Sequence, residues 1–180
     1  YGSKRHMMMD IFGNANNPFY RFYQVLFLQK ISKDYWIPYI IEGFSKTGRS
    51  ISPEFATRIC DTVQCHSWYV QQFSFFIWSA TEDAVSEQIF REQLQILIDT
   101  NAPMFVSDSE SLTPSQIGML AAISNGETKF NSKSVVARYA LGNQQTITRN
   151  KHRLRELDIV EEKDDHFVFV DAVYELWFRQ

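Results

Sequence analysis

The stretch from Thr113 to Val170 constrains the fold more than any other part of this 180-residue chain. The apolar residues of a helix predicted over 143–158 share one face; they are Ile147, Leu154 and Leu157. A shorter helix is predicted over 132–141, and Gly142 stands between the two, where helices commonly end in a left-handed residue. Two short helices joined by a glycine-containing turn are typical of a helix-turn-helix motif.

Two β-rich runs follow this motif, at 159–163 and 166–170, around a pair of aspartates. Such a pair predicts a β-hairpin, which in a helix-turn-helix domain forms a wing. Upstream, the segment Leu112-Thr113-Pro114-Ser115-Gln116-Ile117 combines a capping box with proline at the first helical position. The sequence therefore predicts a winged helix-turn-helix domain over 112–180 that begins at a well-marked boundary.

The part of the chain before this domain predicts a bundle of helices. Ser52-Pro53-Glu54 is a strong helix start, because it combines a capping hydroxyl, proline at the first helical position and an acid in the first turn. Further helices are expected over 67–80 and about 82–99, the last of them ended by Pro103. Pro38 should kink an earlier helix or delay its start.

The charge pattern predicts where nucleic acid would bind. A net charge of −3 gives the chain no overall attraction to DNA, so any basic surface must be local. Such a local surface is available, because every charged residue between Glu127 and Glu156 is basic. The side chains expected to reach phosphates or base edges are Lys133, Gln144, Gln145, Thr148, Arg149, His152, Arg153 and Arg155. The alternative is a protein-docking winged helix, which the acidic residues of the hairpin favour.

The residues show no catalytic constellation and no metal-ligand spacing among the histidines and cysteines. Segment 43–50 nearly spells a phosphate-binding loop, but Arg49 replaces the required lysine and a helical pattern replaces the preceding strand. Two cysteines are too few for a disulfide framework and favour a reducing compartment. No run is long enough for a membrane span, so we expect a cytoplasmic location and no membrane partner.

Several phrases of the sequence, in this order, carry a family resemblance. They are Gly2-Ser3-Lys4 with Met7-Met8, Asn17-Pro18-Phe19-Tyr20-Arg21, His66-Ser67-Trp68-Tyr69-Val70-Gln71, and Phe169-Val170-Asp171-Ala172-Val173-Tyr174-Glu175-Leu176-Trp177. With these phrases the whole chain resembles the C-terminal half of bacterial and archaeal AAA-like, STAND-related ATPases. Those proteins consist of a nucleotide-binding domain, a helical lid and a winged helix.

The resemblance implies three nucleotide-sensing positions. Ser3 would lie at the tip of the sensor-1 strand, Arg21 would act as an arginine finger or intersubunit sensor, and His66 would lie in the lid motif over the nucleotide. Cys65 and Ser67 depart from the glycine and proline usual in that motif, which puts the adenine contact in doubt. ATP and Mg²⁺ are implied as ligands of the full-length protein, and no cofactor is expected on this chain.

The resemblance also implies the domain limits. Residues 1–31 would be the remnant of the nucleotide-binding domain (sensor-1 end, a helix and a strand), 32–106 the helical lid bundle, 107–111 a linker and 112–180 the winged helix. The fold class expected is mainly α.

By itself the chain is not expected to be an enzyme, because the domain with the P-loop and the Walker-B acid would be a missing partner. Its expected role is to couple the nucleotide state of an ATPase to binding of double-stranded DNA or a protein. The alternative is an autonomous winged-helix transcription regulator.

Overall fold

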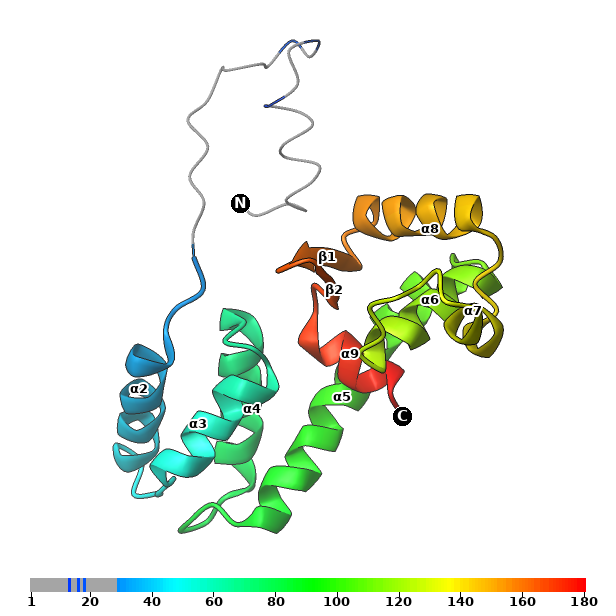
Figure 1. The fold of residues 1–180 in the computed structure, drawn as a ribbon. Helices are drawn as coiled ribbons and strands as arrows, with labels where there is room; N and C mark the ends of the chain where they lie inside the picture. The colour runs from blue at the N-terminus through cyan, green and yellow to red at the C-terminus, as the bar shows by residue number, and fades with distance from the viewer. Residues whose placement is uncertain (1–12, 14–15, 17, 19–28) are drawn as a thin grey trace. The chain divides into compact units, whose positions relative to one another are not determined.

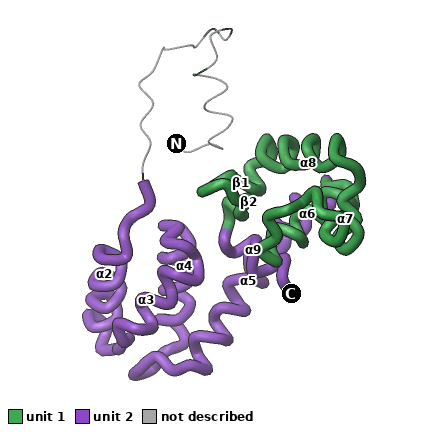
Figure 2. Tube along the Cα trace, viewed as in Figure 1, with its two compact units in different colours: residues 1–28, 112–171 green, residues 29–111, 172–180 purple. Residues whose placement is uncertain are grey.

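The computed structural model describes residues 29–180 together with Gly13, Asn16 and Pro18. The helix and the strand expected within 1–31 therefore lie outside the described residues. Over 29–180 the chain forms two compact units (Figure 2). One contains Leu112–Asp171, and the other contains Gln29–Ser111 with Ala172–Gln180.

The helical unit that begins at Gln29 contains the elements shown in blue to green in Figure 1, with a final helix in red. They are α2 (Lys33–Ser45), α3 (Pro53–Thr62), α4 (Ser67–Ala80), α5 (Glu87–Glu110) and α9 (Ala172–Phe178). Its fully buried side chains include Ile59, Phe73, Ile77 and Leu97. The predicted start of α3 is confirmed, because the Ser52 hydroxyl accepts a hydrogen bond from the backbone N–H of Phe55 at 3.2 Å.

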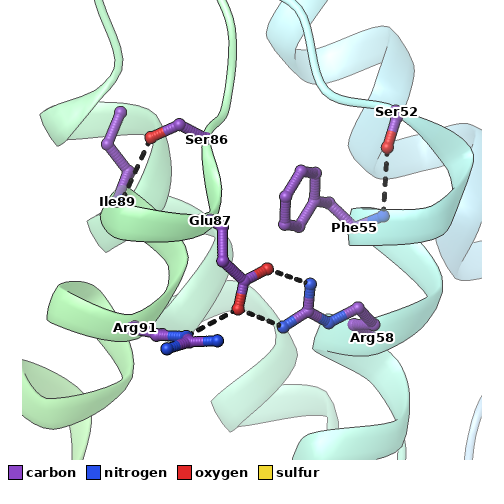
Figure 3. A network of polar contacts seen from close by, with 7 residues as sticks. All are labelled: Ser52, Phe55, Arg58, Ser86, Glu87, Ile89 and Arg91. Atoms are coloured by element: carbon purple, nitrogen blue, oxygen red, sulfur yellow. Dashed lines mark hydrogen bonds and ion pairs between the residues drawn. The ribbon is translucent and has the colours of Figure 1, made fainter.

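A network of charged side chains joins α3 to α5 (Figure 3). The guanidinium of Arg58 donates two hydrogen bonds to Glu87, at 2.5 and 3.1 Å, and Arg91 donates a third at 2.7 Å. The guanidinium of Arg58 also lies 4.2 Å from the centroid of the Phe90 ring. The hydrogen bonds from Arg58, which have the largest effect, and from Arg91 lower the pKa of the Glu87 carboxyl to about 2.

Two expectations about proline in this unit are corrected. Helix α2 starts at Lys33 and contains Pro38, so the delayed start, one of the two effects expected of this proline, is wrong. Helix α5 continues through Pro103 to Glu110, so the prediction that Pro103 ends it is wrong. The expected linker at 107–111 accordingly lies in the last turn of this helix and its cap.

Packing explains why α5 continues. Beyond Pro103, the ring of Phe105 stacks on Tyr174 of α9 with centroids 5.0 Å apart, and Ser109 shares a 2.7 Å hydrogen bond with the same tyrosine. These contacts offset the hydrogen bond that proline removes from the helix. They also explain why α9 belongs to this unit, although the sequence placed residues 172–180 in the winged helix.

The unit at 112–171 is a winged helix-turn-helix, so the predicted fold class is confirmed. Its elements are α6 (Pro114–Ser124), α7 (Lys133–Tyr139), α8 (Gln144–Glu156), β1 (Val160–Lys163) and β2 (His166–Phe169). The two strands pair antiparallel, with Val160 opposite Phe169 and Lys163 opposite His166. Asp164 and Asp165 form the tight turn between them in left-handed conformations, with φ of 50° and 62°.

The turn between α7 and α8 differs in detail from the prediction. Ala140, with φ of 51°, is the left-handed residue that ends α7, and Gly142 is a second one at 79°. Helix α6 approaches α7 closely at Gly118, where an added Cβ would lie 2.0 Å from the carbonyl oxygen of Tyr139. Only glycine allows the two helices to lie this near each other, so Gly118 fixes the spacing of the motif.

Candidate nucleic-acid interface

Helix α8 presents a polar face and buries an apolar one. Asn143 caps its start, because the side-chain oxygen accepts a hydrogen bond from the backbone N–H of Thr146 at 2.9 Å. Ile147 and Leu154 are buried against the rest of the unit. The side chains that the sequence assigned to DNA are all exposed; they are Lys133, Gln144, Gln145, Thr148, Arg149, His152, Arg153 and Arg155.

The structure divides these eight residues into three places. Six of them line an open groove of about 860 Å³ between α8 and the start of α6; they are Gln144, Gln145, Thr148, Arg149, His152 and Arg153. Lys133 begins α7, and Arg155 lies beside the wing, 3.6 Å from the carboxylate of Glu162. One wall of the groove is thus the polar face of α8, and a recognition helix contacts DNA through such an exposed polar face.

Sequence reasoning missed the contribution of α6 to the groove. Thr113 and Ser115, at the start of α6, line its other wall. Asn150 is buried behind the groove face, where its side-chain amide donates a 3.0 Å hydrogen bond to the Ser115 hydroxyl. This hydrogen bond ties α8 to α6, so Asn150 is a positioning residue for the groove.

An acidic residue in the groove was missed as well. The carboxylate of Glu156 lies 3.3 Å from Nδ1 of His152 and 3.4 Å from the guanidinium of Arg153. The signal was present in the sequence, because residues three and four apart on a helix are neighbours. By contrast, no carboxylate lies within ion-pair distance of Arg149 among the residues that the structure describes.

One lysine of the basic run points to a structural role. Lys151 is half-buried, with its ammonium 4.7 Å from the centroid of the Phe130 ring and 5.0 Å from that of Phe167. Placement of a cation between two aromatic rings stabilises the contact between α8 and β2. Lys151 is therefore not part of the candidate DNA surface.

The nucleotide-sensing candidates cannot be assembled into a site. Ser3 and Arg21 lie outside the described residues, and His66 is exposed just before α4, with its ring 4.9 Å from that of Tyr69. Cys65 adopts a left-handed conformation with φ of 54°, which glycine adopts most easily. The turn that precedes α4 therefore contains a non-glycine residue in a backbone conformation that favours glycine. Burial raises the pKa of the neighbouring Cys60 thiol to about 11, so this thiol stays protonated at neutral pH.

Comparison with known proteins agrees with this architecture. Residues 103–180 match a family described as a probable winged helix domain. No curated protein sequence matches the chain. No helix within the described part of the chain combines the length and the hydropathy needed to cross a bilayer.

One solved structure has the same fold over nearly the whole chain. It is the Walker-type ATPase of Pyrococcus abyssi, with a TM-score of 0.73, 15% sequence identity, and alignment over 99% of this chain and 51% of that one. The chain therefore spans about half the length of that ATPase and shares the fold of the matching half. At 15% identity this likeness is one of fold, and it agrees with the resemblance to an ATPase that the sequence carries.

Proposed function

We propose that the chain is the lid and winged-helix module of an AAA-like, STAND-related ATPase, and that its winged helix binds double-stranded DNA. The shared fold with about half of a Walker-type ATPase supports the first part. The helical unit would act as the lid, and ATP with Mg²⁺ would be held by a nucleotide-binding domain present in the same protein. The nucleotide state would then control access of the winged helix to DNA.

The exposed start of α8 is the observation that carries the DNA proposal. Gln144, Gln145, Thr148 and Arg149 lie in the first two turns of α8, from which a recognition helix reaches base edges in the major groove. Arg149 has no carboxylate partner among the described residues, so its guanidinium is available to pair with guanine in two hydrogen bonds. Arg153 would first have to leave Glu156, and Arg155 would have to leave Glu162.

Binding to a protein is the second candidate, and the wing favours it. Glu161, Glu162, Asp164 and Asp165 are exposed on the hairpin and would repel a phosphate backbone. A basic protein surface is the partner that such a wing would accept. We rank this second because the groove lining consists mostly of amide, hydroxyl and basic side chains, which are the groups used for base contacts, with Glu156 as an acidic member.

Titration of fluorescent duplex DNA tests the proposal. The full chain is added to a random 20-base-pair pool at low ionic strength, and anisotropy is followed against salt concentration. Arg149→Ala should weaken binding by about 1–3 kcal/mol and relax the sequence preference. Lys133→Ala should weaken binding to all sequences alike and reduce the salt slope by about one unit.

Two further variants sharpen this experiment. Glu156→Gln should strengthen binding, because it releases His152 and Arg153 from a competing carboxylate. Arg91→Ala is the matched control: it also removes one positive charge, but in the helical unit, and should leave DNA affinity unchanged. Absence of salt-sensitive binding to any duplex would exclude DNA recognition and leave protein docking as the better explanation.

The coupling to nucleotide needs its own measurement. In a protein that carries this chain together with its nucleotide-binding domain, DNA affinity should differ between the ADP state and a state with a non-hydrolysable ATP analogue. Equal affinities in both states would separate DNA binding from ATPase control.

A further inference from the structure

A second groove lies in the helical unit, between α2 and α4. Its volume is about 410 Å³, and its walls come from Trp36 to Thr47 on one side and from Val70 to Trp78 on the other. The indole N–H of Trp78 donates a 2.9 Å hydrogen bond to the Thr47 hydroxyl, which joins the two walls at one end of the groove. Neither the family match nor the ATPase resemblance assigns a ligand to this groove.

The length of the groove favours a chain-like ligand. From Trp36 to Thr47 its wall advances about 16 Å, at roughly 1.5 Å per helical residue. An extended peptide spans that distance with about five residues. An amphipathic helix would need about three turns to do so.

The lining of the groove indicates an uncharged, apolar ligand. Neither wall contributes a charged side chain, and α4 has none along its entire length. Tyr39 and Phe75, on opposite walls, remain 62% and 57% exposed. Large aromatic side chains left exposed around an apolar groove are typical of interaction surfaces.

Two polar atoms on the walls discriminate between an extended peptide and a helix. The indole nitrogen of Trp36, a residue only 6% exposed, and the hydroxyl of Ser74 are buried without a hydrogen-bond partner among the described residues. A buried polar group without a partner costs about 1–3 kcal/mol, so a ligand that pairs it is favoured. An extended peptide brings free backbone carbonyl groups, whereas the carbonyls of a docked helix are already bonded within it. Small rotations of these side chains on binding are common at interfaces.

Gly43 and Arg49 complete the recognition features. An added Cβ at Gly43 meets nothing within 4 Å, so a peptide backbone has room to approach this point of α2. Arg49 lies with its guanidinium 4.3 Å from the centroid of the Trp78 ring, and no carboxylate pairs with it in the described part of the chain. A charge of opposite sign on the ligand would complement it there.

We propose that the α2–α4 groove binds an extended apolar peptide segment of about five residues, followed by an acidic residue that pairs with Arg49. Alternate side chains of the segment would contact the aromatic walls, because successive side chains of an extended chain point to opposite sides. The segment belongs to a partner protein, and the groove is a docking site separate from the DNA-binding face of α8.

Selection from a phage-displayed library of random linear heptapeptides, with the full chain as bait, tests this proposal. Enriched peptides should carry apolar residues two apart followed by Asp or Glu. A synthetic consensus peptide should change the tryptophan emission, because Trp36 and Trp78 line the groove. Gly43→Leu should reduce its affinity at least tenfold by filling the groove, and it should fold normally since the site is open and leucine favours helix.

Two controls make the outcome decisive. Ser45→Leu places the same side chain on α2 outside the groove and should leave peptide affinity unchanged. Arg49→Gln should weaken the acidic peptide severalfold and leave a peptide with the acid replaced by its amide unaffected. The proposal is overturned if no peptide is enriched, if enriched peptides bind Gly43→Leu equally well, or if their apolar residues recur every three or four positions, as in a helix.

Discussion

Substitution of Gly118 by alanine tests how far close packing at one residue determines the helix-turn-helix. In an exposed helix interior this change gains about 1 kcal/mol, because alanine has the higher helix propensity. At Gly118 the new Cβ would lie 2.0 Å from the carbonyl oxygen of Tyr139, which is a backbone atom and cannot rotate away. Helix α6 must then move away from α7. We expect this movement to destabilise the unit by an amount at the upper end of the 1–3 kcal/mol that is typical of overpacking.

The net expected loss is about 1–2 kcal/mol, confined to the unit at 112–171. Amide hydrogen exchange followed by mass spectrometry measures it, because peptides from the two units report their opening free energies separately. Amides in peptides of α6 and α7 should exchange roughly five to thirty times faster in the Gly118→Ala variant than in the unchanged chain. This range follows because each 1.4 kcal/mol of opening free energy changes the exchange rate about tenfold.

Gly43→Ala is the matched control, since its Cβ would meet nothing within 4 Å and helix α2 should become more stable by about 0.5–1 kcal/mol. If Gly118→Ala stabilises its unit as Gly43→Ala does, the close approach of α6 and α7 does not constrain the motif.

Three more outcomes are expected. Asn150→Ala should lower the unfolding free energy of its unit by about 1–3 kcal/mol in urea denaturation, because it removes the part-buried hydrogen bond from the buried Asn150 to Ser115. Thr148→Ala, on the exposed face of α8, should change that free energy by less than about 0.5 kcal/mol. Because the folded pKa of Glu87 is about 2, below its ordinary 4.5, its pairing with Arg58 stabilises the helical unit above pH 4.5 and this stability is lost as the pH falls towards 2. Thermal melts of Glu87→Gln should therefore show a smaller decrease over that interval than the unchanged chain, and equal decreases would count against the network. Cys65→Gly should raise the melting temperature, because it relieves a left-handed non-glycine residue, and an unchanged or lower value would mean that Cys65 packing outweighs backbone strain.

Helix starts could be predicted from the sequence because their causes are local. At three helix starts the capping residue forms a hydrogen bond with the residue three positions later in the chain. The capping residues are Ser52, Thr113 and Asn143. Helix ends could not be predicted as well. Pro103 has the local signal of a helix end, yet Phe105 packs on Tyr174, a residue far along the chain that no local pattern connects to it.

The same distinction applies to the candidate DNA surface. The polar face of α8 follows from helical periodicity, so the sequence could identify its exposed residues. The second wall of the groove depends on the contact of α6 with α8. The hydrogen bond between Asn150 and Ser115 contributes to this contact, and its two residues are 35 positions apart, so no local sequence pattern predicts it. The pairing of Arg155 with Glu162 likewise depends on how the wing folds back beside α8.

The groove on α8 and the groove between α2 and α4 require different partners because their chemistry differs. The groove on α8 is lined by amide, hydroxyl and charged side chains, so its binding should weaken steeply as salt is added. The groove between α2 and α4 has uncharged walls and one cation near its end, so peptide binding there should depend on salt only through Arg49. Each groove is formed within a single unit, and no residue lines both. Salt titration of DNA and peptide binding, with Arg149→Ala and Gly43→Leu tested in both assays, should therefore give independent effects, and a loss of both activities in either variant would indicate unfolding instead of loss of a binding site.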